Sequence, residues 1–143
     1  MPQMNSAMPD QNKELRKAGL KVTMPRVKIL EILESSDETH LSAEDIYQHL
    51  LEEGEQTGLA TVYRVLTQFE SAGLVLRHNF EGGKSVFEID RGEHHDHMVC
   101  TETGQVIEFH NDQIESLQDQ IADEHGYEII GHALVLYVRP KKS

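Results

Sequence analysis

The chain has 143 residues, of which 38 % are apolar, and its formal net charge is −12. This length suits one medium domain or two small ones. The single cysteine excludes an internal disulfide and a multi-cysteine zinc site within one chain. No apolar run approaches the roughly 20 residues that span a bilayer, and the first residues carry no apolar signal region. We therefore expect a cytoplasmic protein with no membrane partner.

Charge is unevenly distributed along the chain. Between residues 13 and 28, six basic residues face one acidic residue, which gives a local balance of +5, while acidic residues dominate most of the rest. Phosphate contacts need lysine and arginine whatever the total charge of a protein. Charge alone favours a solvated helix face, and contact with nucleic acid is the alternative interpretation. The six basic residues are Lys13, Arg16, Lys17, Lys21, Arg26 and Lys28.

Helical patterns fill the first half of the chain. They predict helices over residues 12–19, 23–36, 41–54 and 58–73. Thr23 is the expected N-cap of the second helix, and Ser42 with Asp45 resembles a capping box at the start of the third. The fourth helix carries one apolar stripe, formed by Val62, Val65, Leu66 and Phe69.

A hairpin pattern follows the helices. Residues 74–80 and 84–90 are short runs typical of strands, and the sequence EGG between them indicates a turn. Helices followed by a small hairpin predict a winged helix-turn-helix, which places its last helix in a DNA groove. We assign this domain to residues 1–90.

Residues 91–143 predict a second, smaller domain. Two strands lie at 97–100 and 105–110, an amphipathic helix spans 111–126, and a closing strand or strand pair lies within 127–140. A unit of about 50 residues has little interior of its own, so we expect it to bury a face against a copy of itself. The fold class is therefore α+β, with a C-terminal small α/β dimerisation domain.

The predicted fourth helix suits a DNA groove. Its apolar stripe faces inward and leaves Thr61, Tyr63 and Arg64 on the opposite face. Arginine can bind guanine with two hydrogen bonds, while tyrosine and threonine can contact thymine methyls or phosphates. An ordinary polar surface is the alternative. The basic segment upstream, with Lys21 and Arg26, favours the DNA interpretation.

Four groups that can bind a metal are adjacent in the sequence HHDH. In a strand, alternate residues face opposite sides, so His95 and His97 share one face while His94 and Asp96 share the other. The four residues can therefore serve two sites. Imidazole and carboxylate ligands suit Fe(II), Zn, Mn, Co or Ni, and a solvated histidine-rich loop is the alternative. Candidate partners from elsewhere are His40, Glu88, Glu108, Glu115 and His132.

The sequence as a whole resembles the ferric uptake regulator family of metal-responsive transcriptional repressors, from about Leu15 to Arg139. The resemblance rests on the segments KAGLKVTMPRVKILEIL, HLSAEDIY, GLATVYRVLTQFESAGLV, RHNFEGGKSVFE, HHDHMVC and GQVIEFH. It implies a dimer, or a tetramer, that binds A/T-rich inverted repeats in double-stranded DNA when metal is present. It also implies that Tyr63 and Arg64 read DNA and that Lys21 reaches the minor groove.

The same resemblance implies two metal sites. The regulatory site comprises His40, Glu88, His95, His97 and Glu108. The second site comprises His94, Asp96, Glu115 and His132. Glutamates at positions 88 and 108, with no cysteine in the regulatory set, favour an iron-sensing member that uses Fe(II) as co-repressor; Zn(II) or Mn(II) can substitute in vitro.

One departure from the family pattern concerns cysteine. Many relatives bind a structural zinc through two CxxC motifs, whereas this chain has only Cys100, in the sequence CTET. One thiolate cannot form a tetrahedral site that needs four cysteine ligands, so we expect no zinc of this kind and a buried Cys100. The expected function is a repressor of iron uptake genes rather than an enzyme; the alternatives are a metal storage or buffer protein and a metallohydrolase.

Overall fold

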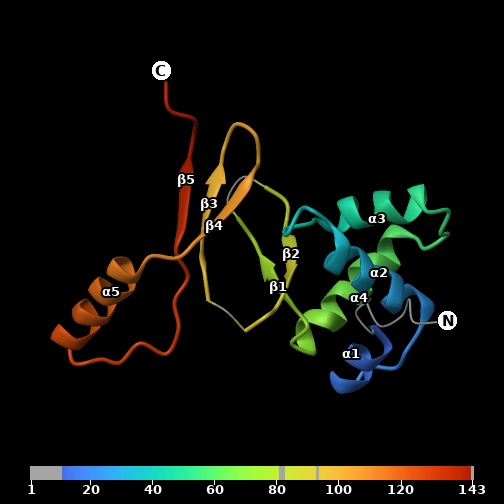
Figure 1. Ribbon diagram of the computed structural model, residues 1–143, viewed down its shortest axis with the longest axis horizontal. Helices are drawn as coiled ribbons and strands as arrows, with labels where there is room; N and C mark the ends of the chain where they lie inside the picture. The colour runs from blue at the N-terminus through green and yellow to red at the C-terminus, as the bar shows by residue number, and fades with distance from the viewer. Residues whose placement is uncertain (1–10, 81–82, 93, 143) are drawn as a thin grey trace, which may run out of the picture. The chain divides into compact units, whose positions relative to one another are not determined.

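The computed structural model describes residues 11–80, 83–92 and 94–142. Its internal contacts divide the chain into two compact units, Met1–Arg91 and Gly92–Ser143. No helix among the described residues is long and apolar enough to cross a membrane. Figure 1 shows helices and a small hairpin in the first unit, and a separate small sheet with one helix in the second.

The described part of the first unit contains four helices and a hairpin. The helices are α1 (Gln11–Lys17), α2 (Met24–Ser35), α3 (Ala43–Glu52) and α4 (Leu59–Ser71). The hairpin consists of β1 (Val75–His78) and β2 (Val86–Ile89), which pair antiparallel. All of these elements were predicted from the sequence pattern, although residues 81 and 82 of the predicted turn lie outside the described residues.

Apolar packing among α1 to α4 and the hairpin forms the core of this unit. Leu15, Leu66 and Phe69 are fully buried, and Phe87 on β2 closes the core from the hairpin side. At the start of α3, the predicted capping box is confirmed: Ser42 Oγ accepts from the backbone N–H of Asp45, and the Asp45 carboxylate accepts from that of Ser42. The cap fixes the chain just after His40.

The second unit contains β3 (Asp96–Cys100), β4 (Val106–Phe109), α5 (Asp112–Glu124) and β5 (Val135–Val138). Its sheet has the order β4-β3-β5, in which β3 pairs antiparallel with β4 and parallel with β5. The predicted succession of two strands, a helix and a closing strand is thus confirmed. The parallel pair requires a crossover, and α5 lies within it.

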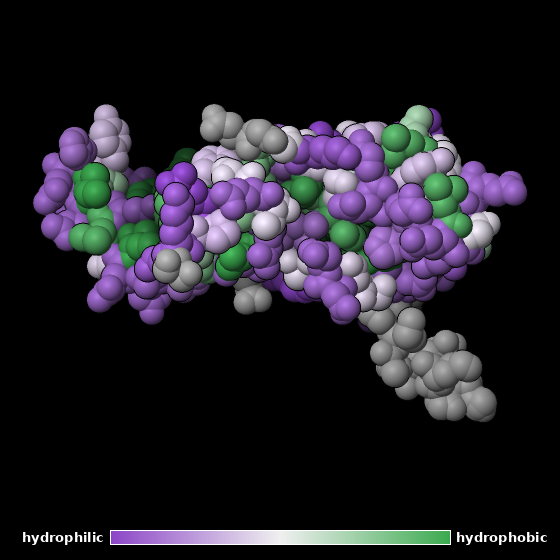
Figure 2. All heavy atoms as spheres, turned by 90° about the horizontal axis from the view of Figure 1, so that it is seen from above, coloured by the Kyte–Doolittle hydropathy of each residue, from purple (hydrophilic) through white to green (hydrophobic). Residues whose placement is uncertain are grey.

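Among the described residues of the second unit, few apolar side chains are buried. None of the residues of α5, all of them described, is buried, and Leu117 and Ile121 are 57 % and 56 % exposed. Ile130, Leu136 and Tyr137 are exposed as well. Figure 2 shows apolar residues, in green, at the surface over α5 and the segment that follows it. Apolar faces of this kind are typical of surfaces that contact a partner.

Candidate metal centres and nucleic-acid interface

A buried aspartate organises the first candidate metal centre, which lies within the second unit. Asp96, the first residue of β3, is 0 % exposed. Its Oδ1 lies 3.2 Å from His94 Nε2 and 3.3 Å from His132 Nε2. Glu115 on α5 brings a second carboxylate, with Oε2 3.6 Å from His132 Nε2. The segment before β3, the segment before β5 and helix α5 therefore each bring a side chain close to Asp96.

The contacts within this group fit a divalent metal ion. His94 Nε2 and His132 Nε2 are 2.9 Å apart, so at most one proton can lie between two nitrogens that both point at Asp96. Asp96 Oδ2 is buried with no hydrogen-bond partner among the described residues, a costly arrangement without a ligand. One ligand atom from each of the four residues lies within 4.8 Å of the others.

A different set of side chains gathers on the other face of β3. His95 Nε2 lies 3.5 Å from Glu108 Oε2. His97 pairs directly with Glu108 across the β3–β4 ladder, so their side chains share a face. The rings of His95 and His97 have their centroids 4.9 Å apart. Alternation along the strand thus separates this group from Asp96 and His94, as the sequence indicated.

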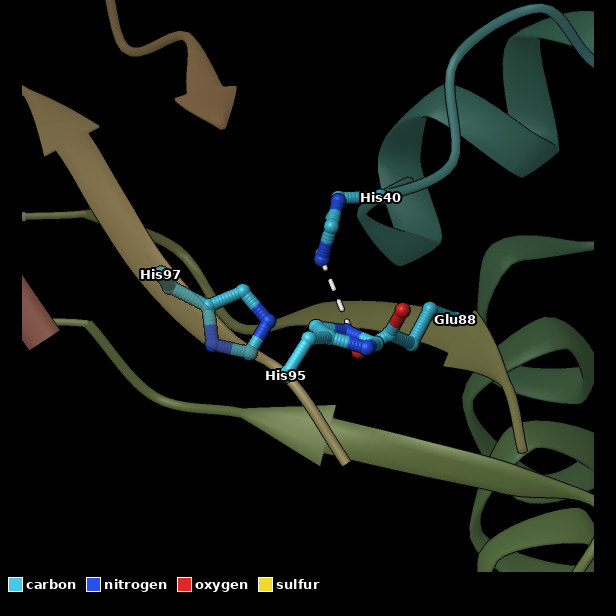
Figure 3. A group of neighbouring side chains, drawn as sticks. All are labelled: His40, Glu88, His95 and His97. Carbon is cyan, nitrogen blue, oxygen red and sulfur yellow. Dashed lines mark ion pairs between the residues drawn. The ribbon is translucent and has the colours of Figure 1, made fainter. Parts of the chain in front are cut away.

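The first unit carries its own pair of ligand residues. His40 Nε2 lies 3.5 Å from Glu88 Oε1, and both side chains are buried. The pair follows from local structure, because an antiparallel bridge between Leu41 and Phe87 sets the neighbouring positions 40 and 88 side by side. Figure 3 draws this pair, joined by its dashed line, and also draws His95 and His97 from the second unit.

His78 is a contact of Glu88 that sequence reasoning missed. Its Nε2 lies in hydrogen-bond contact with Glu88 Oε1. Its ring stacks on that of Phe80, with the two ring centroids 5.4 Å apart. In the hairpin register, Leu76 is opposite Glu88 and His78 is opposite Val86. A diagonal neighbour on the same face was therefore available as a signal once the hairpin had been predicted.

The exposed face of α4 holds the predicted DNA contacts. Val62 and Val65 are buried, Thr61 is half-buried, and Tyr63 and Arg64 are exposed. Arg64 makes no hydrogen bond or ion pair with the part of the chain that the structure describes. Its guanidinium is therefore available at the surface of the helix for a partner from outside the chain.

The two predicted contacts upstream have different surroundings. Lys21 is exposed in the segment between α1 and α2. Arg26 donates to the backbone oxygen of Lys21 at 2.7 Å and to Gln68 Oε1 on α4 at 2.9 Å. Arg26 thus ties the α1–α2 segment to α4, a bracing contact that the sequence pattern did not indicate.

Cys100 ends β3 and is buried, as expected. Hydrogen bonds with Thr103 lower the pKa of its thiol. Neither group of four potential metal ligands among the described residues includes it.

Partly buried clusters of imidazoles and carboxylates, together with a winged helix that exposes arginine and tyrosine, are typical of a metal-binding regulator of DNA-binding type. Residues 17–137 match the model of the ferric uptake regulator family. The chain is 64 % identical over 132 residues to the ferric uptake regulation protein of Pseudomonas aeruginosa, an alignment that covers 92 % of this chain and 98 % of that protein.

Solved structures agree with this match. The ferric uptake regulator of P. aeruginosa with manganese superposes with a TM-score of 0.79 at 61 % identity, covering 94 % of this chain and 100 % of that one. The Vibrio cholerae ferric uptake regulator, whose structure reveals rearranged DNA-binding domains, gives a TM-score of 0.85 at 53 % identity over 92 % and 100 % of the two chains.

The chain therefore belongs to the ferric uptake regulator family. Members of this family are metal-responsive transcriptional regulators and not enzymes, which removes the metallohydrolase alternative. The α+β fold class, with an N-terminal winged helix-turn-helix and a C-terminal small α/β dimerisation domain, is confirmed.

Proposed function

We propose that this protein is an Fe(II)-dependent repressor of iron uptake genes, acting in the cytoplasm as a homodimer on A/T-rich inverted repeats. The observation that supports the proposal is that the predicted regulatory ligands belong to two different units. His40 and Glu88 belong to the winged-helix unit, whereas His95, His97 and Glu108 belong to the other.

Chain connectivity supports a shared regulatory site. His95 follows Glu88 by seven residues, a span of at most about 25 Å when fully extended. Buried His40 and Glu88 would hold one side of the ion, and His95, His97 and Glu108 the other. A bound divalent cation supplies positive charge and fixed coordination directions. With all five ligands engaged, the two units are held at one angle to each other.

The magnitudes are sufficient for a switch. Moving an equilibrium from 1:99 to 99:1 needs about 5.5 kcal/mol of differential binding. Structural zinc sites bind their metal with gross free energies of ~10–16 kcal/mol. An open arrangement of the units that loses two of the five ligands would bind the ion more weakly, and this difference in binding free energy is large enough to drive the switch. The same arrangement would hold Tyr63 and Arg64 of each copy at major grooves about one turn apart.

The second site, formed by His94, Asp96, Glu115 and His132, has a different role in this proposal. All four residues belong to one unit, so their ligation would fasten α5 to the sheet rather than orient the two units. A fixed α5 presents Leu117 and Ile121 together, and these residues are our candidates for the interface with a second copy.

The donor set is compatible with several metals. Imidazole and carboxylate ligands accept Fe(II), Mn(II) or Zn(II), and the similar P. aeruginosa protein was solved with manganese. We propose Fe(II) as the resident ion because both carboxylates of the regulatory set are glutamates, Glu88 and Glu108, with no cysteine beside them.

A gel-shift titration on an A/T-rich palindrome tests the proposal. Wild-type protein should bind the duplex with Fe(II) or Mn(II) and lose it on chelation. Glu108→Ala should weaken metal-dependent binding by at least the roughly 10- to 100-fold that follows loss of an outer-shell partner, with folding intact. His110→Ala is the matched control, because His110 is an exposed histidine outside both ligand sets.

Arg64→Ala separates regulation from storage. In a repressor this variant should lose specific DNA binding and keep its metal content, measured by elemental analysis. Arg139→Ala, an exposed arginine of the other unit, serves as the control. If metal-free and loaded protein bind the duplex equally, the regulatory scheme is wrong; if neither binds any duplex, the storage alternative holds.

A further inference from the structure

One hydrogen bond joins the exposed faces of α3 and α4. Tyr63 Oη donates to Glu44 Oε2 at 2.7 Å. Glu44 is the second residue of α3, next to the capping box that fixes the start of that helix. Tyr63 lies on the face of α4 that also carries Arg64, and its side chain is 41 % exposed. The contact therefore lies at the surface that the proposed function directs towards DNA.

The chemistry of this pair decides how the Tyr63 hydroxyl can bind. A phenol has one proton and two lone pairs, and an ionised carboxylate only accepts. The hydrogen bond lowers the pKa of Glu44 and raises the pKa of Tyr63, so the carboxylate is ionised and the phenol protonated at neutral pH. Because the proton is directed at Glu44, the hydroxyl offers only lone pairs to any further partner.

Base edges and phosphates differ in what they offer to such a hydroxyl. In the major groove, adenine N6 and cytosine N4 are donors, whereas adenine N7, guanine O6 and N7 and thymine O4 accept. Phosphate oxygens of the backbone only accept as well. An acceptor-only hydroxyl suits the amines and cannot satisfy the acceptors. The charge of Glu44 adds to this discrimination, since a carboxylate beside the ring repels phosphate.

We propose that Glu44 is a specificity-determining residue that fixes the Tyr63 hydroxyl as an acceptor, so that Tyr63 reads an adenine amine in the major groove and is kept off the phosphate backbone. This inference rests on the proposed function, in which α4 enters the groove. Glu44 acts through Tyr63 and is a positioning residue with no DNA contact of its own.

Base analogues test the inference with intact, Mn(II)-loaded protein. The duplex is an A/T-rich inverted repeat selected by the wild-type protein from a random pool. Each adenine is replaced in turn by 2-aminopurine, which pairs with thymine but lacks the amine in the major groove. Wild-type binding should fall roughly tenfold, the equivalent of one good hydrogen bond, at one position of each half-site.

Variants of Tyr63 and Glu44 test whether the weaker binding of the 2-aminopurine duplex depends on these two residues. Tyr63→Phe should bind the selected duplex and the 2-aminopurine duplex equally. Glu44→Ala should reduce the tenfold preference to about threefold or less and raise affinity for unrelated duplex DNA, because the freed proton can reach acceptors. Glu44→Gln, whose amide oxygen can accept the phenol proton, should restore most of the preference. Glu52→Ala removes another exposed carboxylate of α3 and is the matched control.

A titration reports on the contact itself. Followed by the ultraviolet absorbance of tyrosinate, Glu44→Ala should remove a component that ionises above the normal tyrosine range, and Tyr63→Phe should remove the same component. A mere loss of helix stability does not produce this change.

The outcomes separate the two proposals. If Tyr63→Phe and Arg64→Ala both bind the selected duplex like the wild type, α4 does not contact DNA and the proposed function fails. If those variants bind weakly while Glu44→Ala keeps the full preference for adenine, the role of Glu44 alone is wrong. A preference that survives in Tyr63→Phe would also overturn it.

Discussion

Helices α4 and α5 have the same length, 13 residues, and both carry an apolar stripe, yet they differ completely in burial. In α4 the stripe from Val62 to Phe69 is buried in the core of the first unit. In α5 the stripe that includes Leu117 and Ile121 is exposed. A stripe at helical spacing shows that a helix has a face to cover, but not what covers it.

Because of this difference, we expect the two units to depend on different sources of stability. The first unit buries helices from its own chain against one another, so its stability depends on its own packing. In the second unit no residue of α5 is buried, and Glu115 of this helix contacts His132 in the segment before β5. We therefore expect its stability to depend on metal and on a second copy, both of which act through concentration.

The largest expected difference in stability is between two variants, each of which truncates one apolar side chain, one in α4 and one in α5. Phe69→Ala should cost about 3–5 kcal/mol because the ring is fully buried. Leu117→Ala in dilute protein should change stability by less than about 0.5 kcal/mol, as surface substitutions do. Hydrogen exchange, resolved by segment, measures both. A large loss from Leu117→Ala at concentrations where sedimentation finds only monomer would contradict the comparison.

Metal should have an effect confined to the second unit when only its own four ligands are available. In a background that carries both His95→Ala and His97→Ala, the regulatory set has lost its imidazoles from the second unit. There, an ion at about 100 times its dissociation constant should stabilise the second unit by about 2.7 kcal/mol. Protection of α5 amides should rise and return to its initial value with a chelator, while amides of α4 should not respond. Asp96→Ala removes the fully buried ligand and should abolish the rise. Equal protection of both helices would show that the four ligands do not act locally.

Much of the fold followed from local patterns. Periodicity located all five helices that the described residues form. Ser42 with Asp45 marked the start of α3 because a capping box needs only residues close in sequence. Alternation placed His94 and Asp96 apart from His95 and His97 for the same reason. These features depend on geometry within a few residues, which the sequence states directly.

Other contacts could not be predicted because they join distant segments through tertiary packing. The hydrogen bond from Tyr63 to Glu44 depends on how α3 packs on α4, and the bracing of α4 by Arg26 depends on the path of residues 18–23. His78 beside Glu88 required the hairpin register as well as its existence. No pattern in one segment specifies such pairings.

The smallest expected effect distinguishes two N-caps within the first unit. Ser42→Ala should lower the free energy of unfolding by about 1 kcal/mol. The substitution removes the side-chain acceptor of the Asp45 N–H and so breaks the capping box at a buried position. Thr23→Ala is the matched control: Thr23 is the N-cap of α2, but its side chain makes no capping hydrogen bond, so the cost should be much smaller. Urea unfolding of both variants measures the difference. Equal losses would mean that the stability comes from the extended backbone at the cap position rather than from the hydrogen bond, and that the chain beside His40 is fixed by the Leu41–Phe87 bridge instead.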